Sequence, residues 1–202
     1  MIIEFGDRNQ ADADMGMREQ VRDSLARAQP KRLAGGYDRE AAVLMPIFER
    51  GDEPHFLLTR RTEEVSTHKG QISFPGGMRH DGESLQQTAL RETFEEVGVE
   101  PSRVEILGRF NDYISITGHL VAPFAGYLEG DFTVVPQKAE VAEVLEVPFR
   151  IFSDPARLRT ERMFRLGRFM DVYFYRYEPH EIWGLTARMI KDFIDVLSRF
   201  KS

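Results

Sequence analysis

The sequence predicts a single α/β domain, and three observations support this prediction. Apolar runs of strand length alternate with turn residues through the middle of the chain. Apolar residues recur at helical spacing within residues 12–28 and again near the C-terminus, at Ile190, Phe193, Ile194 and Leu197. No repeat, low-complexity tract or linker interrupts the 202 residues. We therefore expect residues 1–40 to form an N-terminal helix and lead-in, and residues 41–202 to form the main domain.

Turn residues place the boundaries of the expected strands. The strands are expected at residues 41–48, 55–60, 71–74, 104–110, 113–116 and 119–128, with a hairpin over 163–177. Residues 141–149 fit either a strand or a short helix. The N-terminal helix is expected to end at Gln29-Pro30, and Ile182-Trp183-Gly184 leads into the final helix.

Composition excludes several classes of protein. The chain has no cysteine, which excludes disulfides and thiolate zinc sites. It has no signal-peptide pattern at its start and no apolar run of the length that a membrane helix needs. Its net charge is −6, which argues against a general nucleic-acid partner. We therefore expect a cytoplasmic protein with neither a nucleic-acid nor a membrane partner.

Residues 77–99 concentrate acidic residues beyond what folding or solubility requires. A helix is expected between Ser84, which can cap it through its hydroxyl, and Gly98, which can adopt a left-handed conformation. On that helix the carboxylates of Glu92, Glu95 and Glu96 share one face because they stand at positions i, i+3 and i+4. The opposite face, predicted to pack against the core, carries Leu90, Phe94 and Val97. Clustered carboxylates repel one another, and a divalent cation with oxygen ligands offsets that repulsion.

The same stretch fits the pattern Gly-x5-Glu-x7-Arg-Glu-U-x-Glu-Glu-x-Gly-U, where U is a bulky apolar residue. The positions in register are Gly77, Glu83, Arg91, Glu92, Glu95, Glu96, Gly98 and Val99. This pattern resembles the signature of the Nudix hydrolases, and the departure is Thr93 at the first U position. The resemblance implies an α/β/α sandwich with a mixed β-sheet between helices, and cleavage of a nucleoside diphosphate linked to another moiety. The other reading is a solvated acidic helix face.

Oxygen-ligand chemistry suggests a role for each charged residue. Mg²⁺ or Mn²⁺ held by Glu92, Glu95 and Glu96 would neutralise the leaving phosphate. The backbone carbonyl of Gly76 or Gly77 would add a further oxygen ligand. Arg91 stands four residues before Glu95 and is predicted to pair with it. This pairing would fix the rotamer of the Glu95 carboxylate.

The identity of the general base stays open. Glu92 can serve as the base on the attacking water instead of as a ligand. The resemblance also implies that a glutamate of a later loop adds a metal contact or the base. Glu140 and Glu143 are the candidates for that glutamate, and a solvated surface charge is the other reading of each.

A second set of motifs flanks the acidic helix. Leu57-Leu58-Thr59-Arg60-Arg61 and Phe74-Pro75-Gly76-Gly77 precede it, and the segment 182–188, Ile-Trp-Gly-Leu-Thr-Ala-Arg, follows near the C-terminus. Together they look like the coenzyme A diphosphatase branch of the Nudix hydrolases. The chain departs from that branch where Ser66 replaces a usual arginine and Thr62 a usual Ser or Ala. Arg60, Arg61 and Lys69 are therefore the candidate phosphate-binding cations.

Other side chains in the flanks have structural readings. His68 and His119 are interpreted as hydrogen-bonded loop residues rather than catalytic ones. Trp183 and the aromatic residues of segment 173–177 can stack on adenine, but alternating aromatic residues more often pack within a sheet.

The resemblance implies a metal-dependent hydrolase that cleaves the diphosphate of coenzyme A or an acyl derivative to 3′,5′-ADP and (acyl-)4′-phosphopantetheine. The alternatives are hydrolysis of another nucleoside diphosphate derivative such as ADP-ribose and, in a different class, a nucleotide sensor without activity. The expected partner is this small-molecule substrate, and a homodimer is a candidate assembly.

Overall fold

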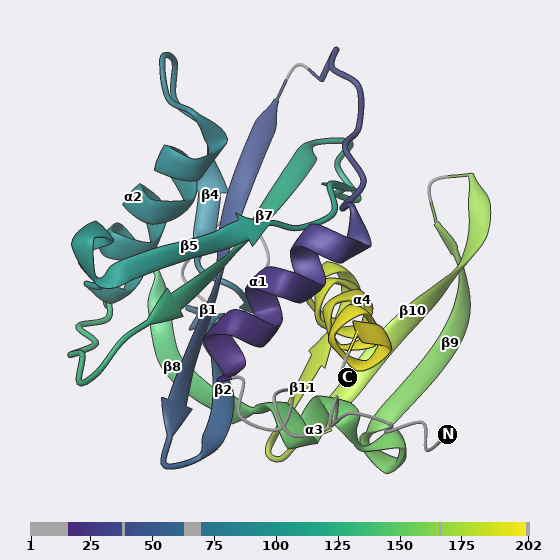
Figure 1. The fold of residues 1–202 in the computed structure, drawn as a ribbon. Helices are drawn as coiled ribbons and strands as arrows, with labels where there is room; N and C mark the ends of the chain where they lie inside the picture. Colours follow the sequence, from purple (N-terminus) through teal and green to yellow (C-terminus); the bar gives the residue numbers. More distant parts are fainter. Residues whose placement is uncertain (1–15, 38, 63–69, 166, 201–202) are drawn as a thin grey trace, which may run out of the picture.

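The computed structural model describes residues 16–37, 39–62, 70–165 and 167–200, and these residues form two β-sheets with helices packed against them (Figure 1). The eight-stranded sheet contains β1 (Glu40–Arg50), β2 (Glu53–Arg61), β3 (Ile72–Ser73), β4 (Gly76–Met78), β5 (Val104–Arg109), β6 (Tyr113–Ile114), β7 (Leu120–Leu128) and β8 (Val141–Pro148). The three-stranded sheet contains β9 (Leu158–Arg165), β10 (Arg168–Tyr177) and β11 (His180–Trp183). The α-helices are α1 (Met17–Ala28), α2 (Leu85–Val97), α3 (Phe149–Ser153) and α4 (Gly184–Phe200), and short 3₁₀ helices cover Pro101–Arg103 and Pro155–Arg157.

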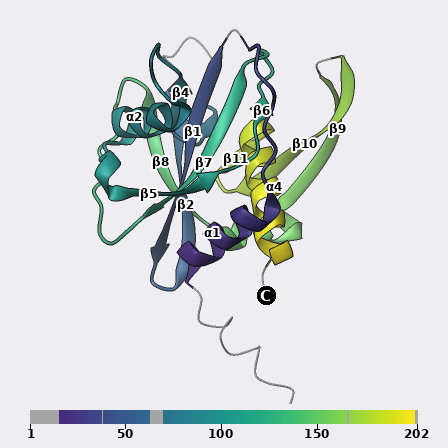
Figure 2. The same cartoon turned by 45° about the horizontal axis from the view of Figure 1, so that its top comes forward.

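The large sheet is mixed. Its main order is β3-β2-β1-β7-β5, with β4 paired to β1, β6 to β7 and β8 to β2. The β1 and β7 strands run parallel, whereas the other pairs are antiparallel. Figure 2 shows α2 on one face of this sheet and α1 and α4 on the other. The predicted α/β/α sandwich is thus confirmed.

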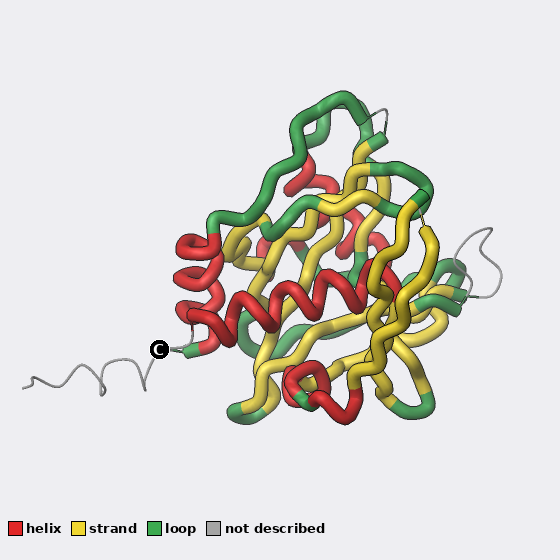
Figure 3. The backbone as a smooth tube through the Cα atoms, turned by 90° about the vertical axis from the view of Figure 1, so that its right-hand side faces the viewer, coloured by secondary structure: helices red, strands yellow, loops and turns green. Residues whose placement is uncertain are grey.

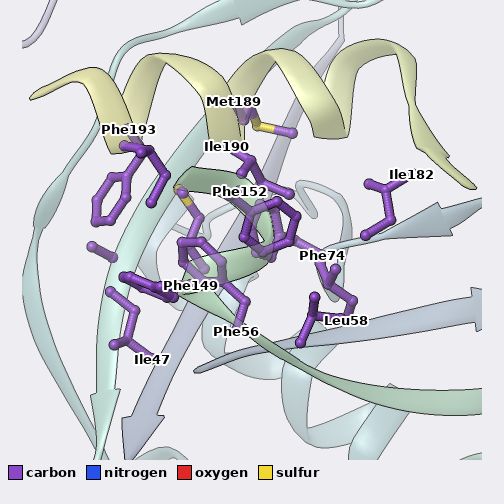
Figure 4. Packing of buried hydrophobic residues seen from close by; sticks show 14 of the residues in the cluster. Ile47, Phe56, Leu58, Phe74, Phe149, Phe152, Ile182, Met189, Ile190 and Phe193 are labelled. Atoms are coloured by element: carbon purple, nitrogen blue, oxygen red, sulfur yellow. The ribbon is translucent and has the colours of Figure 1, made fainter. Parts of the chain in front are cut away.

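The largest core cluster lies between the large sheet and α4, which crosses the strands in Figure 3. Phe56 of β2 is fully buried there, and its ring centroid lies 4.3 Å from that of Phe149 and 5.7 Å from that of Phe193 (Figure 4). Leu58 points into the same cluster, whereas Leu57 packs in a separate cluster with Val97 of α2. β2 therefore supplies side chains to both faces of the sheet, as a strand period of two requires.

Most predicted elements are present, with three differences. The expected strand at 71–74 is the two-residue strand β3, which pairs with β2, and an additional short strand, β4, follows it and pairs with β1. Residues 141–149 are mostly the strand β8, and α3 begins at Phe149. The segment at 180–183 is a strand, β11, rather than only the approach to the last helix. These short strands follow from tertiary pairing, which local propensity does not encode.

The N-terminal helix shares the main core. Val21 and Leu25 of α1 are buried in the same cluster as the residues of α4. The division into a lead-in of residues 1–40 and a domain of residues 41–202 stays a prediction. Within the described residues, no helix combines the length and the apolarity needed to cross a membrane.

Candidate active site

The acidic helix α2 begins and ends where its sequence predicts. The hydroxyl of Ser84 accepts a hydrogen bond from the backbone N–H of Gln87 at 3.2 Å, and the Gln87 side chain accepts one from the N–H of Ser84 at 2.9 Å. Gly98 has φ of 72° and donates its N–H to the carbonyl of Phe94 at 2.8 Å. This capping box and left-handed C-cap fix the start and the end of the helix that carries the carboxylates.

The rotation of α2 about its axis differs from the prediction. Val97 is buried as expected, but Phe94 is 44% exposed and Leu90 is only partly buried. The buried face is instead formed by Thr88, Ala89, Thr93, Glu96 and Val97. Thr93 donates to the carbonyl of Ala89 at 2.7 Å, so its hydroxyl is satisfied inside the helix.

Small side chains explain this rotation. Ala89 lies in a cluster with Ala42 of β1 and Ala122 of β7, where α2 packs against the sheet. A small residue at position 93 fits a helix that lies so close to the strands, and a bulkier one at that position would push it away.

The three carboxylates differ in burial. The side chain of Glu96 is 6% exposed, that of Glu92 16% and that of Glu95 53%. The acidic face therefore runs from the sheet to the surface of the molecule, and the deepest carboxylate lies against β2.

Gly77 makes room for Glu92. A Cβ atom on Gly77 would lie 2.4 Å from Oε1 of Glu92, so that only glycine permits this approach of the carboxylate to the backbone. Gly76 has a comparable restriction, because its Cβ would lie 2.4 Å from the carbonyl oxygen of Ala42. Burial raises the pKa of Glu92, and the charges of Glu95 and Glu140 add to that rise while Arg91 opposes it.

Arg91 links the acidic residues of α2 to the segment that precedes the helix. Its Nη1 donates to Glu92 and to Glu95 at 2.9 Å each, its Nε donates to Glu83 at 2.7 Å, and its Nη2 donates to the carbonyl of Met78 at 3.1 Å. The predicted Arg91–Glu95 pair is therefore present. The hydrogen bond from Arg91 is the main reason that the pKa of Glu83 is lowered to about 2.

Glu96 lies between α2 and β2. Its Oε2 is 3.5 Å from the hydroxyl of Thr59, and its Oε1 is 3.7 Å from Nη1 of Arg61. Burial raises its pKa to about 8, a rise that Arg61 and Thr59 oppose and that the charges of Glu92 and Glu140 increase. The upstream motif therefore contacts the acidic helix directly, through Thr59 and Arg61.

The predicted substrate-binding cations do not gather at one place. Arg61 faces Glu96, whereas Arg60 pairs with Glu143 of β8 at 3.0 Å, on the other face of β2. His180 of β11 contacts the same carboxylate at 3.4 Å. Lys69 and His68 lie outside the described residues.

The two later glutamates have different positions. Glu143 is held by Arg60 and His180, and the hydrogen bond from Arg60 lowers its pKa. The charge of Glu140, by contrast, contributes to the raised pKa of both Glu92 and Glu96.

Backbone hydrogen bonds anchor the loop that carries Glu140. The N–H groups of Val135 and Gln137 donate to the last carbonyls of α2, those of Val97 and Glu96, at 2.9 Å each. These bonds satisfy carbonyl groups that every helix end leaves free. Their effect is to fix the path of the chain toward Glu140.

The remaining sequence candidates have structural surroundings. His119 contacts the hydroxyl of Thr117 through Nδ1 at 3.3 Å, within a turn. Tyr175 is buried in the core, and Phe174 stacks against Trp183 with ring centroids 6.0 Å apart. Burial of Tyr175 and Phe174 agrees with the interpretation of these residues as packed sheet residues, whereas Trp183 is 45% exposed and its role stays open.

The carboxylates of Glu92, Glu95 and Glu96 are oxygen ligands of the kind that a hard divalent cation prefers. Their side chains are not, however, arranged around one common point. Within the described residues, no group of three or more acidic or histidine side chains converges as metal ligands. The protein's own cations explain this, since Arg91 bonds Glu92 and Glu95 while Arg61 faces Glu96. The buried Glu96 has no hydrogen bond shorter than 3.5 Å from a described residue, which is an environment that a cation would improve. A metal site at Glu92, Glu95, Glu96 and Gly77 stays a prediction.

The sandwich fold and the acidic helix agree with the family of hydrolases that the comparisons show, which act on phosphorus anhydrides. The NUDIX domain model matches residues 38–167, and the chain belongs to the Nudix hydrolase family. It is accordingly an enzyme that hydrolyses a nucleoside diphosphate derivative.

Relatives and solved structures agree with this family. The "Uncharacterized Nudix hydrolase NudL" of Photorhabdus laumondii is 40% identical over 80% of this chain and 86% of its own length. The protein of the same name from Escherichia coli O7:K1 is 37% identical over 76% of this chain and 80% of its own.

Among solved structures, a MutT/nudix family protein from Enterococcus faecalis has a TM-score of 0.53 at 17% identity, over 96% of this chain and 76% of its own. The C. elegans Ap4A hydrolase has a TM-score of 0.51 at 15% identity, over 81% of this chain and 98% of its own. At such identities the similarity shows the fold alone.

Proposed function

We propose that the enzyme hydrolyses the diphosphate bond of coenzyme A or an acyl derivative to 3′,5′-ADP and (acyl-)4′-phosphopantetheine. The observation that carries this proposal is the contact of the upstream motif with the acidic helix. Thr59 and Arg61, from the segment that resembles the coenzyme A diphosphatase branch, both face Glu96. The residues that suggest the substrate thus adjoin the residues that suggest the reaction.

The downstream segment supports the same substrate. β11 packs beside β3, the strand that pairs with Thr59 and Arg60 of β2. Ile182 of β11 is fully buried in the main core, and Gly184 starts α4 next to Gln71. Both flanking motifs therefore meet at the same edge of the large sheet, next to β2.

We assign roles to the residues of this site as follows. Glu92, Glu95 and Glu96, with the carbonyl of Gly77, hold Mg²⁺ or Mn²⁺, which when bound neutralises charge on the diphosphate and activates water. Arg91 orients Glu92 and Glu95 through the bonds described above. Arg61 and Lys69 bind substrate phosphates, whereas Arg60 is held away from the acidic helix by Glu143.

Glu140 is our candidate for the general base. It is exposed, and its charge acts on both Glu92 and Glu96. Glu143 is less suited, because Arg60 and His180 already hold its carboxylate. In this assignment Glu140 accepts a proton from the attacking water, and Glu92 serves as a metal ligand.

A substrate panel tests the proposal. Purified protein with Mg²⁺ or Mn²⁺ is offered coenzyme A, acetyl-coenzyme A, ADP-ribose and diadenosine polyphosphates, and products are separated by chromatography. We expect the highest kcat/KM for coenzyme A or its acyl form, with 3′,5′-ADP as a product. Faster turnover of ADP-ribose or of a dinucleotide would refute the substrate and keep the class of enzyme. Binding without turnover of any compound would favour the sensor.

Two further properties belong to the same proposal. We propose that the enzyme is cytoplasmic and that a homodimer is the candidate assembly. Fractionation of cells and light scattering of the purified protein test these two statements independently of the substrate.

A further inference from the structure

Arg61 and Glu96 form a loosely held pair at the inner end of the acidic face. The side chain of Arg61 is 26% exposed and that of Glu96 is 6% exposed. Their closest charged atoms are 3.7 Å apart, which is too long for a hydrogen bond. The Nε of Arg61 is buried and has no hydrogen-bond partner among the described residues. The guanidinium therefore lies beside the Glu96 carboxyl group without being hydrogen-bonded to it.

The other two arginines of this region are held much more firmly. Arg91 donates hydrogen bonds to three carboxylates and a backbone carbonyl. Arg60 donates from Nε to Glu143 at 3.0 Å. Arg61 is thus the arginine whose guanidinium has the least to lose by leaving its position.

A divalent cation on Glu96 would compete with Arg61. Both cations would occupy the space beside the same carboxylate, and two positive charges a few ångströms apart in a partly buried site repel each other strongly. The metal carries the larger charge and takes oxygen ligands directly. Its arrival therefore favours release of Arg61 from Glu96.

The released guanidinium has a suitable destination. Arg61 is the last residue of β2, and the next residue, Thr62, donates its N–H to the carbonyl of Glu140 at 2.9 Å. Arg61 thus stands at the same edge as the candidate base. A guanidinium presents paired N–H donors that match two oxygens of a phosphate.

We propose that Arg61 is an exchangeable counter-ion: it pairs with Glu96 in the metal-free enzyme and moves to the diphosphate of the substrate once a metal ion occupies Glu96. This inference rests on the proposed metal site and deepens it, because it makes metal binding the step that frees a phosphate-binding arginine. The exchange is a side-chain movement in which no covalent bond changes. It predicts that removal of the Arg61 guanidinium strengthens binding of the metal ion and weakens binding of the substrate.

Mn²⁺ binding to the substrate-free protein, measured by calorimetry, gives the first readout. We expect Arg61→Gln to bind Mn²⁺ about fivefold more tightly than the wild type, because a competing cation is gone. Arg60→Gln is the matched control: it removes the same charge one residue away, from a guanidinium that Glu143 holds, and should leave Mn²⁺ affinity within about twofold of wild type. Thermal melting confirms that each variant is folded.

Steady-state kinetics at saturating Mn²⁺ give the second readout. Arg61→Gln should raise KM for coenzyme A about tenfold with a smaller change in kcat, since it removes binding of a phosphate. Arg61→Lys keeps the charge but not the paired donors, so it should keep a Mn²⁺ affinity near wild type while KM still rises. Tighter metal binding with weaker substrate binding is a combination that a merely structural role of Arg61 does not produce.

Several results would overturn the inference. Unchanged or weaker Mn²⁺ binding by Arg61→Gln would show that Arg61 does not compete with the metal. An equal increase in Mn²⁺ affinity in Arg60→Gln would show that the loss of any nearby positive charge has this effect, and that Arg61 has no special role. Wild-type Mn²⁺ affinity in Glu96→Gln would place the metal elsewhere and refute the inference together with the metal site. Absence of coenzyme A hydrolysis with the expected Mn²⁺ result would refute only the proposed substrate, and KM would then be measured with the compound that is cleaved.

Discussion

The Cα of Gly77 faces the carboxylate of Glu92 so closely that a methyl group there would lie 2.4 Å from Oε1 and 2.6 Å from Oε2. Gly77 belongs to β4 and Glu92 to α2, so this contact lies between the strand and the acidic helix. Any larger residue at position 77 must therefore move Glu92 or separate the two elements.

Gly77→Ala should lower kcat/KM by about 100-fold, because a displacement of about 1 Å in a catalytic group has consequences of that size. Kinetics with Mg²⁺ and the preferred substrate give the measurement. Gly35→Ala is the matched control, since a Cβ on Gly35 would meet nothing within 4 Å. Near-normal turnover by Gly77→Ala would show that the position of Glu92 is not critical.

Arg91→Lys should also lower activity, by about 100-fold, although it preserves the charge. One ammonium group cannot replace a planar guanidinium that bonds Glu83, Glu92, Glu95 and the carbonyl of Met78 at once. The free energy of unfolding should fall by about 1–2 kcal/mol, which urea denaturation measures.

The control for this substitution is Arg27→Lys, which alters an exposed arginine paired with Asp23 within α1. It should change the free energy of unfolding by less than about 0.5 kcal/mol. A fully active Arg91→Lys enzyme would contradict the orienting role of Arg91.

Features of the fold and site that depend on neighbouring residues in the chain were predictable. Ser84 and Gly98 mark the ends of α2 because capping uses backbone groups within a few residues. The Arg91–Glu95 pair likewise follows from helical spacing. Such signals are complete in the sequence and need no knowledge of the tertiary structure.

The rotation of α2 was not predictable in the same way. Hydrophobicity alone favours Phe94 over Thr93 as a core residue, yet Thr93 is buried and Phe94 is exposed. The reason is the close approach of the helix to Ala42 and Ala122, which are distant in the chain. The separation of Arg60 from Arg61, by contrast, follows from the two-residue period of a strand, and the sequence did contain that signal.

Glu140→Gln should lower kcat by about 100-fold and leave Mn²⁺ affinity within about threefold of wild type, if Glu140 is the base. Glu92→Gln should weaken Mn²⁺ binding by about tenfold or more, because it removes a charged ligand. Kinetics across pH and calorimetry of both variants give the comparison, with Glu143→Gln as the control for a loop glutamate that is held elsewhere. A larger loss of kcat in Glu92→Gln at saturating Mn²⁺ than in Glu140→Gln would assign the base to Glu92.

Glu96→Gln should stabilise the metal-free protein at pH 8, because it removes a buried charge. Burial raises the pKa of Glu96 to about 8 in the folded state, whereas an unfolded glutamate has a pKa of about 4.3. Between these values the folded protein binds one proton more than the unfolded chain, so the free energy of unfolding of the wild type falls as pH rises from about 4.3 to 8. After relaxation of the site, the variant should exceed the wild type by about 1–3 kcal/mol at pH 8 and by much less at pH 5.

Urea denaturation in EDTA at both pH values measures this difference. With saturating Mn²⁺ at pH 8 the wild type should instead be more stable than Glu96→Gln. The metal stabilises the ionised carboxylate of the wild type, and a ligand that binds only the folded state raises the stability of that state. An equal effect of Glu96→Gln at pH 5 and pH 8 would show that the carboxylate does not titrate in this window.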